Sequence, residues 1–429
     1  MKNLIKKFIP NWLLSFYHWK WALLGALFFG WPSRKIKVIG VTGTKGKSTV
    51  VFLAGKILNA AGKKTGWVSS LTINDGQKEI MNPFHMTMPG RFFIQKTLRQ
   101  MIKNGCQYAI VEVTSEGIKQ HRHRFINWAG AVFTNLAPEH LEAHGGFENY
   151  RAAKMKLFAA AAKNKESFGV YNLDDENAAW FLKYPVKKKY GYGELTREIL
   201  KEDFATLTIT DIKLSAQGSE FKINNVHFKT NLLGEFNVYN CAAAAAIGEA
   251  CDAPLLKASE TLAQVQSIPG RLEIINEGQD FTVVVDLAHT PDSFEKVFKL
   301  FQNLPHERLI SVFGSAGGGR DKWKRPELGR IASQYSDQIF ICNEDPYDED
   351  PLQIAEQIFE GSNKNKADII LDRREAIAKA LSLARRGDIV LILGKGTEQT
   401  YVEGAKKIHW DDREVVRQEL KKLTKIDNL

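Results

Sequence analysis

Glycine, lysine and serine are spaced for phosphate binding in the segment GVTGTKGKSTV, residues 40–50. The strict P-loop form G-x-x-x-x-G-K-[ST] would need a glycine at Val41, so only the shorter form remains, with Gly43, Gly46, Lys47 and Ser48. In that form, backbone N–H groups at a helix N-terminus face a phosphate, Lys47 adds a positive charge, and the Ser48 hydroxyl can reach Mg²⁺. The segment therefore favours a nucleotide-phosphate site over a glycine-rich turn without a ligand.

The elements that must position this loop alternate between strands and helices. Residues 37–43 are expected to form a buried strand, and residues 47–62 a helix that Gly62 ends. Further buried strands are expected at 108–115, 129–136 and 168–175, short antiparallel strands between 206 and 233, and an alanine-rich helix at 237–251. This βαβ rhythm predicts an α/β fold with a central P-loop-type parallel-sheet ATPase domain.

A second, smaller domain is expected after the junction at Pro269-Gly270. Strand-plus-loop units at 281–290, 309–321, 338–346 and 388–396 alternate with helical patterns, which predicts a Rossmann-like α/β domain. The expected organisation is a basic and apolar N-terminal segment at 1–33, a central ATP-binding domain at 34–267 and a C-terminal domain at 268–429. A length of 429 residues supports more than one hydrophobic core.

The charge and the cysteine content indicate the cellular compartment and exclude some classes of partner. The four cysteines lie far apart with no CxxC pair, which favours a reducing compartment and argues against a zinc site. The net charge is +10, yet no zinc spacing, helix-turn-helix or RNP-like strand accompanies it, so nucleic acid is not expected as a partner. We expect a cytoplasmic monomer.

The N-terminal segment has an unusual composition. No acidic residue occurs before Asp75, and Trp, Phe and Leu are frequent between Phe8 and Trp31. Residues 21–31 are too short an apolar run to span a bilayer, which needs about 20 residues. Two readings remain open: peripheral contact with the inner face of the cell membrane, or helices that pack on the protein's own body.

The loop, written T-G-T-K-G-K-S-T, resembles the ATP loop of the Mur ligase superfamily. Other segments follow in the order found in its MurE-type members, which add the third residue of the stem peptide. They read VEVTSEG, TNLAPEHLEAHGGFENYRAAKMKLF, LLGEFNVYNCAAAAA, IPGRLE, VVDLAHTPDSFEKVF, VFGSAGGGRDKWKRP and GKGTEQ. The resemblance runs from about Lys37 to the C-terminus, and the motifs together are specific.

The resemblance implies an ATP-dependent ligase that phosphorylates a carboxylate and lets an amino acid displace the phosphate. The implied catalytic residues are Lys47, His140, Lys154 and Arg271. The implied ATP-binding residues are Gly43, Thr44, Lys45, Gly46, Lys47, Ser48, Thr49, Asn135, Arg271, Asp286, His289 and Asp321. Two Mg²⁺ ions are implied, with Ser48, Glu112, His140 and Lys154 as ligands, the last as a carbamate derived from CO₂. Lys324 and Arg325 are expected in a basic loop nearby, and closure of the two domains is expected because each carries part of the set.

The resemblance also places the substrates. Glu344, Asp345, Tyr347, Gly394 and Glu398 are implied to contact the amino acid. Enzymes that take diaminopimelate read D-N-P-R where this chain reads Glu344-Asp345-Pro346-Tyr347, and the missing arginine favours L-lysine or ornithine over diaminopimelate unless Arg373 or Arg374 supplies the clamp. The acceptor is expected to be a muramyl peptide, linked to a nucleotide or to lipid, because the segment before Ile36 is too short for the usual uridine-nucleotide domain.

Other functions are compatible with parts of the same sequence. Within the superfamily, a folylpolyglutamate synthetase or a polyglutamate ligase would share the loop. A P-loop NTPase or kinase would hydrolyse or transfer phosphate without an amino acid, but it leaves Lys154 and the second domain unexplained. A scaffold that has lost catalysis would not need the set of Lys47, Ser48, Glu112, His140 and Lys154. Each alternative predicts a different dependence of phosphate release on the amino acid.

Overall fold

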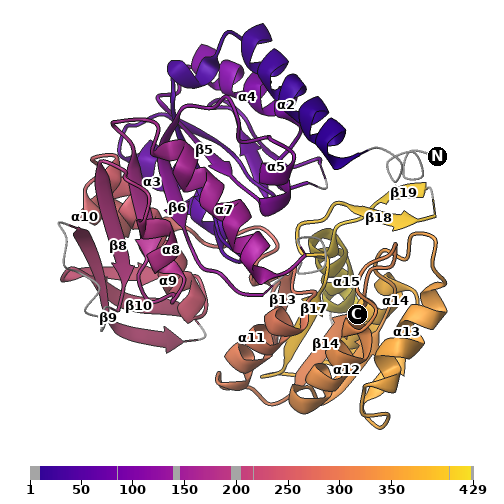
Figure 1. Cartoon of the computed structure of the whole chain (residues 1–429). Helices are drawn as coiled ribbons and strands as arrows, with labels where there is room; N and C mark the ends of the chain where they lie inside the picture. The colour runs from indigo at the N-terminus through magenta and orange to yellow at the C-terminus, as the bar shows by residue number, and fades with distance from the viewer. Residues whose placement is uncertain are drawn as a thin grey trace. The chain divides into compact units, whose positions relative to one another are not determined.

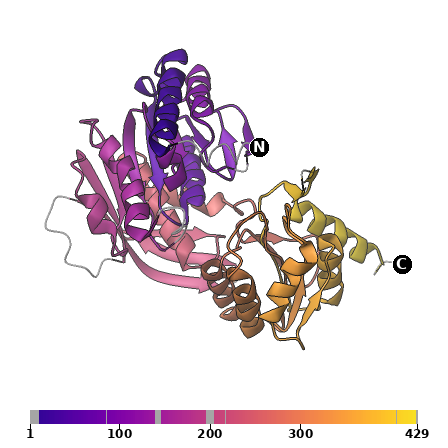
Figure 2. The ribbon, with the colours of Figure 1, turned by 45° about the vertical axis from the view of Figure 1, so that its right-hand side comes forward.

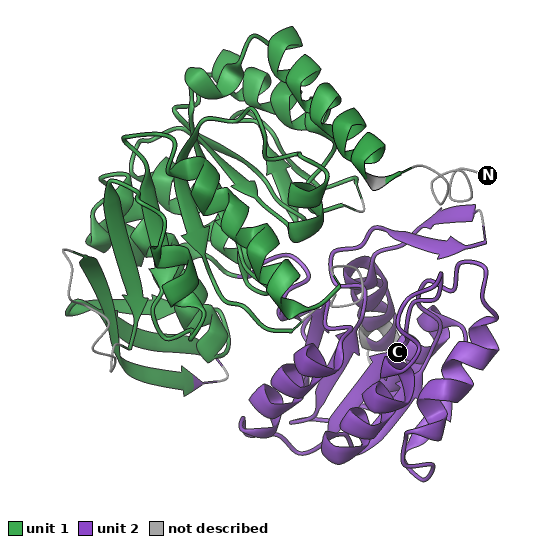
Figure 3. Ribbon diagram, viewed as in Figure 1, with its two compact units in different colours: residues 1–214, 218–266 green, residues 215–217, 267–429 purple. Residues whose placement is uncertain are grey.

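The computed structural model describes residues 10–84, 86–138, 145–194, 204–215, 217–404 and 406–426. The chain divides into two compact units (Figure 3). Unit 1 comprises residues 1–214 and 218–266, and unit 2 comprises residues 215–217 and 267–429.

Unit 1 is built on an eleven-stranded sheet in the order β11-β10-β9-β8-β7-β6-β1-β5-β2-β3-β4 (Figure 1). Its strands are β1 (Lys37–Thr42), β2 (Thr65–Val68), β3 (Thr72–Asn74), β4 (Glu79–Met81), β5 (Tyr108–Glu112), β6 (Trp128–Phe133), β7 (Phe168–Asn172), β8 (Lys188–Gly193), β9 (Ala205–Ser215), β10 (Gly218–Ile223) and β11 (Val226–Thr230). Pairing is parallel from β2 through β5, β1, β6, β7 and β8 to β9. The central strands are continuous apolar runs because helices cover both faces of a parallel sheet.

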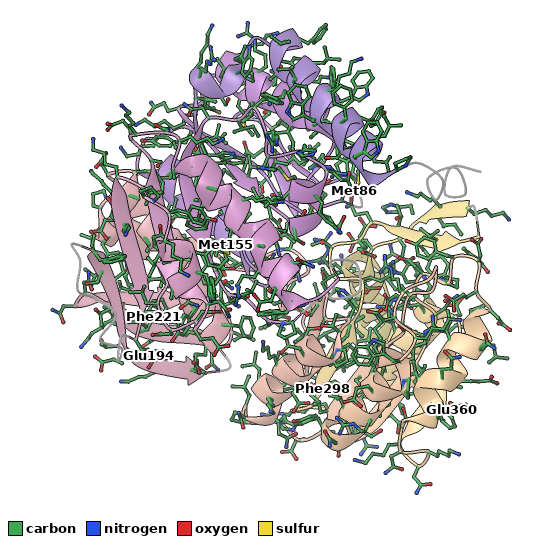
Figure 4. The ribbon with its side chains drawn as sticks, in the orientation of Figure 1. Met86, Met155, Glu194, Phe221, Phe298 and Glu360 are labelled. Carbon is green, nitrogen blue, oxygen red and sulfur yellow. The ribbon has the colours of Figure 1, made fainter. Side chains whose placement is uncertain are left out.

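The helices of unit 1 bury the faces of this sheet. They are α3 (Lys47–Ala60), α4 (Arg91–Lys103), α5 (Ser115–Lys119), α7 (Phe147–Ala161), α8 (Ala178–Leu182), α9 (Glu235–Ala250) and α10 (Leu255–Gln264). One core cluster joins α4, α7 and α8 to the sheet, and Phe133 of β6 stacks on Phe181 of α8 at 4.1 Å between ring centroids. Helices α3 and α9 pack on each other. In the antiparallel extension, Phe221, labelled in Figure 4, stacks on Phe228.

Helix α2 (Asn11–Phe28) precedes the sheet and packs along α4 (Figures 1 and 2). A short 3₁₀ turn, η1 (Pro32–Arg34), connects it to β1. One half of α2 carries exposed large side chains, which we call the exposed apolar face: Trp12, Leu13, Phe16, Tyr17, Trp21, Leu24, Leu27 and Phe28. Among the described parts of the chain, no helix is both long enough and apolar enough to cross a membrane.

Unit 2 contains a six-stranded sheet in the order β12-β13-β17-β14-β15-β16, parallel except for the pair β12 and β13. Its strands are β12 (Glu273–Ile275), β13 (Thr282–Asp286), β14 (Leu309–Phe313), β15 (Gln338–Ile341), β16 (Ala367–Ile369) and β17 (Ile389–Leu393). The helices are α11 (Pro291–Gln302), α12 (Lys324–Tyr335), α13 (Pro351–Glu360), α14 (Arg373–Leu383) and α15 (Asp412–Ile426). A hairpin of β18 (Thr400–Glu403) and β19 (Lys406–His409) completes it.

The predicted fold class is confirmed: a larger unit built on a mainly parallel sheet carries the phosphate-type loop, and a smaller α/β unit follows. In both units, the loops that carry the candidate site residues follow the carboxyl ends of parallel strands, where ligands bind in open α/β sheets. The predicted domain boundaries stay predictions.

Candidate active site

The phosphate-type loop lies between β1 and α3, as the sequence predicts. Gly46 has φ = 80°, and a Cβ atom there would lie 2.2 Å from the Asn240 side-chain oxygen. A Cβ atom on Gly43 would lie 1.9 Å from the Thr134 hydroxyl. Only glycine fits at these two points. The first backbone N–H groups of α3, from Lys47 onward, are therefore presented at the loop, because the opening turn of a helix leaves them without intrahelical partners.

Glu112, the last residue of β5, contacts several polar groups at and beside the loop. Its side chain is buried, and Oε2 accepts hydrogen bonds from the Ser48 hydroxyl at 2.8 Å and the Ser70 N–H at 2.8 Å. The Lys47 Nζ lies 4.0 Å from Oε1 and donates to the Thr44 carbonyl at 2.8 Å. A buried carboxylate that touches a hydroxyl offers the oxygen ligands that Mg²⁺ prefers. The predicted pair of Ser48 and Glu112 is thus in contact.

Lys154 points from α7 onto the same loop. The side chain is 2% exposed, its Nζ donates to the Gly43 carbonyl at 2.6 Å, and it lies 4.5 Å from the centre of the Tyr150 ring. The Tyr150 hydroxyl in turn contacts the Thr44 hydroxyl at 3.2 Å. Lys156, two residues further along, is exposed. Lys154 is therefore buried at the loop and Lys156 faces solvent. The carbamate on Lys154 stays a prediction.

Two further site predictions have different outcomes. The Asn135 amide brackets the loop, because its oxygen accepts from the Lys45 N–H at 2.9 Å and its nitrogen donates to the Lys45 carbonyl at 3.1 Å. Its proposed contact with adenine stays a prediction. His140 lies outside the described residues. Within the described ranges, no group of three or more His, Cys, Asp or Glu side chains is placed to hold a metal ion.

A cationic cluster lies beyond α5, which begins three residues after Glu112. Arg122 donates to the Met88 carbonyl and to the Gln120 side-chain oxygen, the latter at 2.7 Å, and Arg91 contacts His18 and the Gln120 carbonyl. The Nε atoms of both arginines are buried and make no hydrogen bond with any described residue. Burial lowers the pKa of each arginine, and Arg91 lowers that of Arg122 further. An anion would be stabilised here.

In unit 2, the predicted nucleotide residues gather at the end of β13. The Asp286 carboxylate is buried and accepts hydrogen bonds from the Leu272 and Ala288 N–H groups at 2.8 and 2.7 Å. Burial raises the pKa of Asp286, and the neighbouring Arg271 opposes this shift. The His289 carbonyl accepts from the Lys324 Nζ at 3.1 Å.

The basic loop before α12 divides into exposed and buried residues. Asp321 is exposed, whereas Arg325 is fully buried. Arg325 donates to Glu349 at 3.0 Å and to Gln357 at 2.8 Å, so its guanidinium stabilises the packing of α12 against α13. Burial lowers the pKa of Lys324, while the Glu344 carboxylate has the opposite effect.

Three carboxylates surround one buried lysine at the end of β17. The Lys395 Nζ donates to Asp345 at 3.0 Å and to Glu398 at 3.2 Å. Burial alone would lower the pKa of Lys395, but Glu398, Asp345 and Glu344 together raise it. Glu344 is buried, and its Oε2 has no hydrogen-bond partner in the part of the chain that is described. Lys324 and the Asp412-paired Arg373 also interact electrostatically with Glu344, so these cations compensate the three carboxylates in part, and a partly compensated acidic set suits a further ammonium.

Gly394 is required beside this acidic set. Its φ is 113°, and a Cβ atom there would lie 2.4 Å from the Glu344 Oε2. Burial raises the pKa of Glu398, and Lys395 opposes that shift. Glu344 follows β15 and Gly394 follows β17, and the two loops place a buried carboxylate oxygen next to a residue without a side chain. The proposed contacts with the amino acid stay a prediction.

The two arginines considered as carboxylate clamps are already engaged. Arg373 is buried, and its guanidinium pairs with Asp412 at 2.6 and 2.8 Å. Arg374 pairs with Glu419 at 2.6 Å. Tyr347 stands where the clamping arginine would be, and its backbone lies in the left-handed region with φ = 54°. These contacts favour the reading that no arginine of this set holds a distal carboxylate.

Comparison with known proteins follows the same division of the chain. The model of the Mur ligase middle domain matches residues 41–248, and that of the Mur ligase glutamate ligase domain matches residues 270–396. A UDP-N-acetylmuramyl-tripeptide synthetase from Borreliella afzelii is 39% identical, over 93% of this chain and 80% of the relative. The chain belongs to the Mur ligase family.

Other members of the Mur ligase family show similar coverage. The UDP-N-acetylmuramoyl-L-alanyl-D-glutamate–2,6-diaminopimelate ligase of Syntrophomonas wolfei is 37% identical, over 93% of this chain and 81% of that protein. A solved diaminopimelate ligase of the same name matches with a TM-score of 0.62 and 29% identity, over 91% of this chain and 79% of that one. Folylpolyglutamate synthase of Mycobacterium tuberculosis, solved with ADP and AMPPCP, has a TM-score of 0.70 at 16% identity, over 94% of each chain, which shows the fold alone.

Several candidate residues were missed from the sequence. Asn240 touches the loop at Gly46, and its signal was the pair of asparagines in FNVYN, three residues apart on one helix face. Arg122 belongs to the basic run QHRHR, and Lys395 to GKGTEQ, both of which could have been singled out. Arg91 opens α4 after a glycine and carries no motif, so sequence reasoning offered no signal for it.

Proposed function

We propose that this chain is an ATP-dependent ligase that joins an amino acid to a muramyl-peptide carboxylate in peptidoglycan precursor synthesis. The observation that carries the proposal is the convergence of Lys47, Ser48 and Lys154 on one loop beside the buried Glu112. Support comes from relatives named as tripeptide synthetase and diaminopimelate ligase, and from a family member solved with ADP. We propose ATP as the co-substrate and the cytoplasm as the site of the reaction.

The chemistry proceeds in two balanced steps. A carboxylate oxygen of the acceptor attacks the γ-phosphorus of ATP, and ADP leaves, giving an acyl phosphate. The amine of the amino acid then attacks the acyl carbon, loses a proton, and phosphate departs as the amide forms. Both steps gather anionic oxygens, so the positive charge of Lys47 and the N–H groups at the start of α3 stabilise the transition states.

Mg²⁺ fits the residues present, because the Ser48 hydroxyl and the Glu112 carboxylate are in contact and both are hard oxygen donors. We propose that these two residues hold one ion and that His140 and a carbamylated Lys154 serve a second. When bound, Mg²⁺ supplies charge neutralisation for the phosphates. The Lys154 ammonium would lose one proton, and the resulting amine would react with CO₂ to give a carbamate and a second proton, so that a cation beside Gly43 would become an anion.

The acceptor peptide is proposed to bind at the cationic cluster. Arg91 and Arg122 present buried Nε–H groups that have no acceptor among the described residues. Arginine holds carboxylates through directed pairs of hydrogen bonds. The cluster follows Glu112 by one short helix, and α5 contacts α7, the helix that carries Lys154.

The amino acid is proposed to carry a free ammonium group to the acidic set of Glu344, Asp345 and Glu398. Lys395 compensates only part of that charge. We therefore favour L-lysine or ornithine over diaminopimelate, whose distal carboxylate would face these acids without the arginine clamp. Asp348, exposed in the same loop, adds to the negative field.

Peripheral contact with a membrane through the N-terminal segment is also part of the proposal. Its support is the exposed apolar face of α2 together with the absence of acidic residues before Asp75. Such a contact would suit an acceptor that is linked to lipid.

The test is an assay of phosphate release in a matrix of acceptors and amino acids. We expect release to require a muramyl-dipeptide acceptor and one diamino acid, with L-lysine preferred. Acceptors linked to UDP and to lipid are compared side by side to identify the carrier. Release that is unchanged when every amino acid is left out would favour an NTPase, and release that requires a pterin conjugate with glutamate would favour the folylpolyglutamate-type reaction.

A further inference from the structure

The exposed apolar face of α2 cannot be explained by packing within unit 1. The opposite half of the helix is covered, because Ala22 and Ala26 are buried, and Gly25 lies against the Phe92 ring. Yet Trp12 is 72% exposed and Phe28 is 78% exposed, at the two ends of the helix. A helix that is apolar all round is normally buried on all sides. One half of α2 therefore lacks a cover in the described structure.

Polar and aromatic contacts fix the orientation of this face. The Ser15 hydroxyl contacts the His121 ring at 2.8 Å, and His18 contacts Arg91. Trp19 packs edge-on against Phe125 with ring centroids 5.6 Å apart. These contacts tie the inner half of α2 to the loop after α5 and to the start of α4. The outer half is consequently held away from the body of unit 1 rather than free to turn inward.

We propose that the exposed apolar face of α2 docks into the interface of an anionic lipid bilayer, with the helix lying in the membrane plane. This rests on the membrane contact proposed above and deepens it by naming the lipid partner and the orientation of the helix. The face mixes Trp, Tyr, Phe and Leu, the residue types that settle at the level of lipid headgroups. An 18-residue helix is about 27 Å long, and it would insert as a monotopic element because it cannot span the bilayer.

Charge identifies the occupant as lipid of negative charge. Lys20 lies near the middle of the exposed face, and Arg34 and Lys35 are exposed just after the helix. A lysine at the centre of an inserted face can extend its ammonium to the headgroups while its stem stays among apolar groups. With no acidic residue before Asp75, nothing in this part of the sequence opposes anionic lipid.

A second copy of the chain is a poorer occupant of the same face. In a symmetric pair of antiparallel helices, the middle of one face meets the middle of the other. That arrangement would bring the two Lys20 ammonium groups together in a desolvated interface. Like charges at such a position are destabilising, so the second copy is an outcome for the test and not the proposal.

The experiment measures co-sedimentation of the full chain with vesicles of phosphatidylcholine, with and without phosphatidylglycerol. We expect binding that requires phosphatidylglycerol and weakens with salt. Leu27→Ser should weaken it roughly tenfold, because Leu27 is half exposed and would bury the rest of its surface in the bilayer. Leu256→Ser is the matched control, since Leu256 is 62% exposed on α10. Point substitutions are preferred to deletion of the segment, which would uncover Phe92 and Phe125.

Several outcomes would overturn the inference. They are no vesicle binding by the unaltered chain, equal binding by Leu27→Ser and Leu256→Ser, and a dimer in sedimentation velocity that Leu27→Ser dissociates. Far-ultraviolet circular dichroism confirms that each variant is folded. Ligase turnover without vesicles should be the same for Leu27→Ser and the unaltered chain, so failure of the membrane inference is distinguishable from failure of the proposed ligase function.

Discussion

Replacement of Glu344 by Gln tests the proposed ammonium site most directly. The Glu344 Oε2 is buried beside Gly394 and makes no hydrogen bond with a described residue, so the isosteric amide removes a charge without removing a structural contact of that atom. Lys395 keeps Asp345 at 3.0 Å and Glu398 at 3.2 Å. We therefore expect a folded protein that binds the amino acid poorly.

The size of the effect follows from the bond that is lost. A hydrogen bond between an ammonium and a buried carboxylate contributes about 1.5–3 kcal/mol. That loss corresponds to roughly a 10- to 150-fold increase in the KM for the amino acid. The KM for ATP should change little, because Glu344 is not among the predicted ATP-binding residues of either unit. The expected signature is thus a selective loss of affinity for one of three substrates.

The assay is steady-state phosphate release with the amino acid varied at saturating ATP and acceptor. Glu360→Gln, at the exposed end of α13 and labelled in Figure 4, is the matched control for loss of one negative charge from unit 2. An amino-acid KM for Glu344→Gln that stays equal to that of the control would refute the ammonium site. An equal increase in the KM for ATP would show that the change had disturbed the unit as a whole.

Three further predictions concern unit 1. Lys154→Ala should abolish amide formation, with partial rescue by a short-chain carboxylate, whereas the control Lys156→Ala should be active. Full activity of Lys154→Ala, measured by chromatography of the product, would remove the carbamate from the mechanism. Gly46→Ala should lower ATP affinity at least tenfold in calorimetry, because a backbone cost of about 1–2 kcal/mol adds to the clash with the Asn240 amide. Gly62→Ala is the control and should bind ATP normally, since Gly62 also has a positive φ of 75° but has open space around it. Burial lowers the pKa of His123 to about 3, so the folded state keeps the ring neutral and stability is lost as the pH falls from 6.5 towards 3. At pH 5 the loss relative to pH 7 should reach about 2 kcal/mol, and thermal unfolding of His123→Leu should show a smaller decrease over that range.

Much of the fold was predictable because parallel strands buried on both faces leave a strong apolar signal. The strands that flank the phosphate-type loop and those at 309–313 and 389–393 were recognised in this way. The short strands β2, β3 and β4 were not, because three or four residues are too few to show a period. Strand β12 was also missed, since it lies at the sheet edge as an antiparallel addition.

The candidate site was predictable where a motif fixes the residue, and less so where the tertiary structure selects it. Ser48 and Glu112 are 64 residues apart, and their contact depends on the parallel pairing of β1 with β5, which brings two strand ends together. The position of Arg325 in a basic run predicts that it lies in an active-site loop, yet the structure buries it against Glu349. Sequence order alone cannot tell which of several neighbouring basic residues points inward, because that choice is made by the packing of α12.

The contact between His18 and Arg91 links helix α2 to the guanidinium that is proposed to bind the acceptor. The proposed acceptor carboxylate would compete with the imidazole for the N–H groups of Arg91, and the proposed attachment of α2 to lipid would hold that imidazole in place. Coupling between two binding sites is reciprocal. A change in the membrane affinity of α2 on acceptor binding therefore implies an equal change in the affinity for the acceptor on membrane binding. With the acceptor at Arg91 and α2 on lipid, as proposed above, the affinity for the acceptor is expected to differ between dilute buffer and a lipid surface.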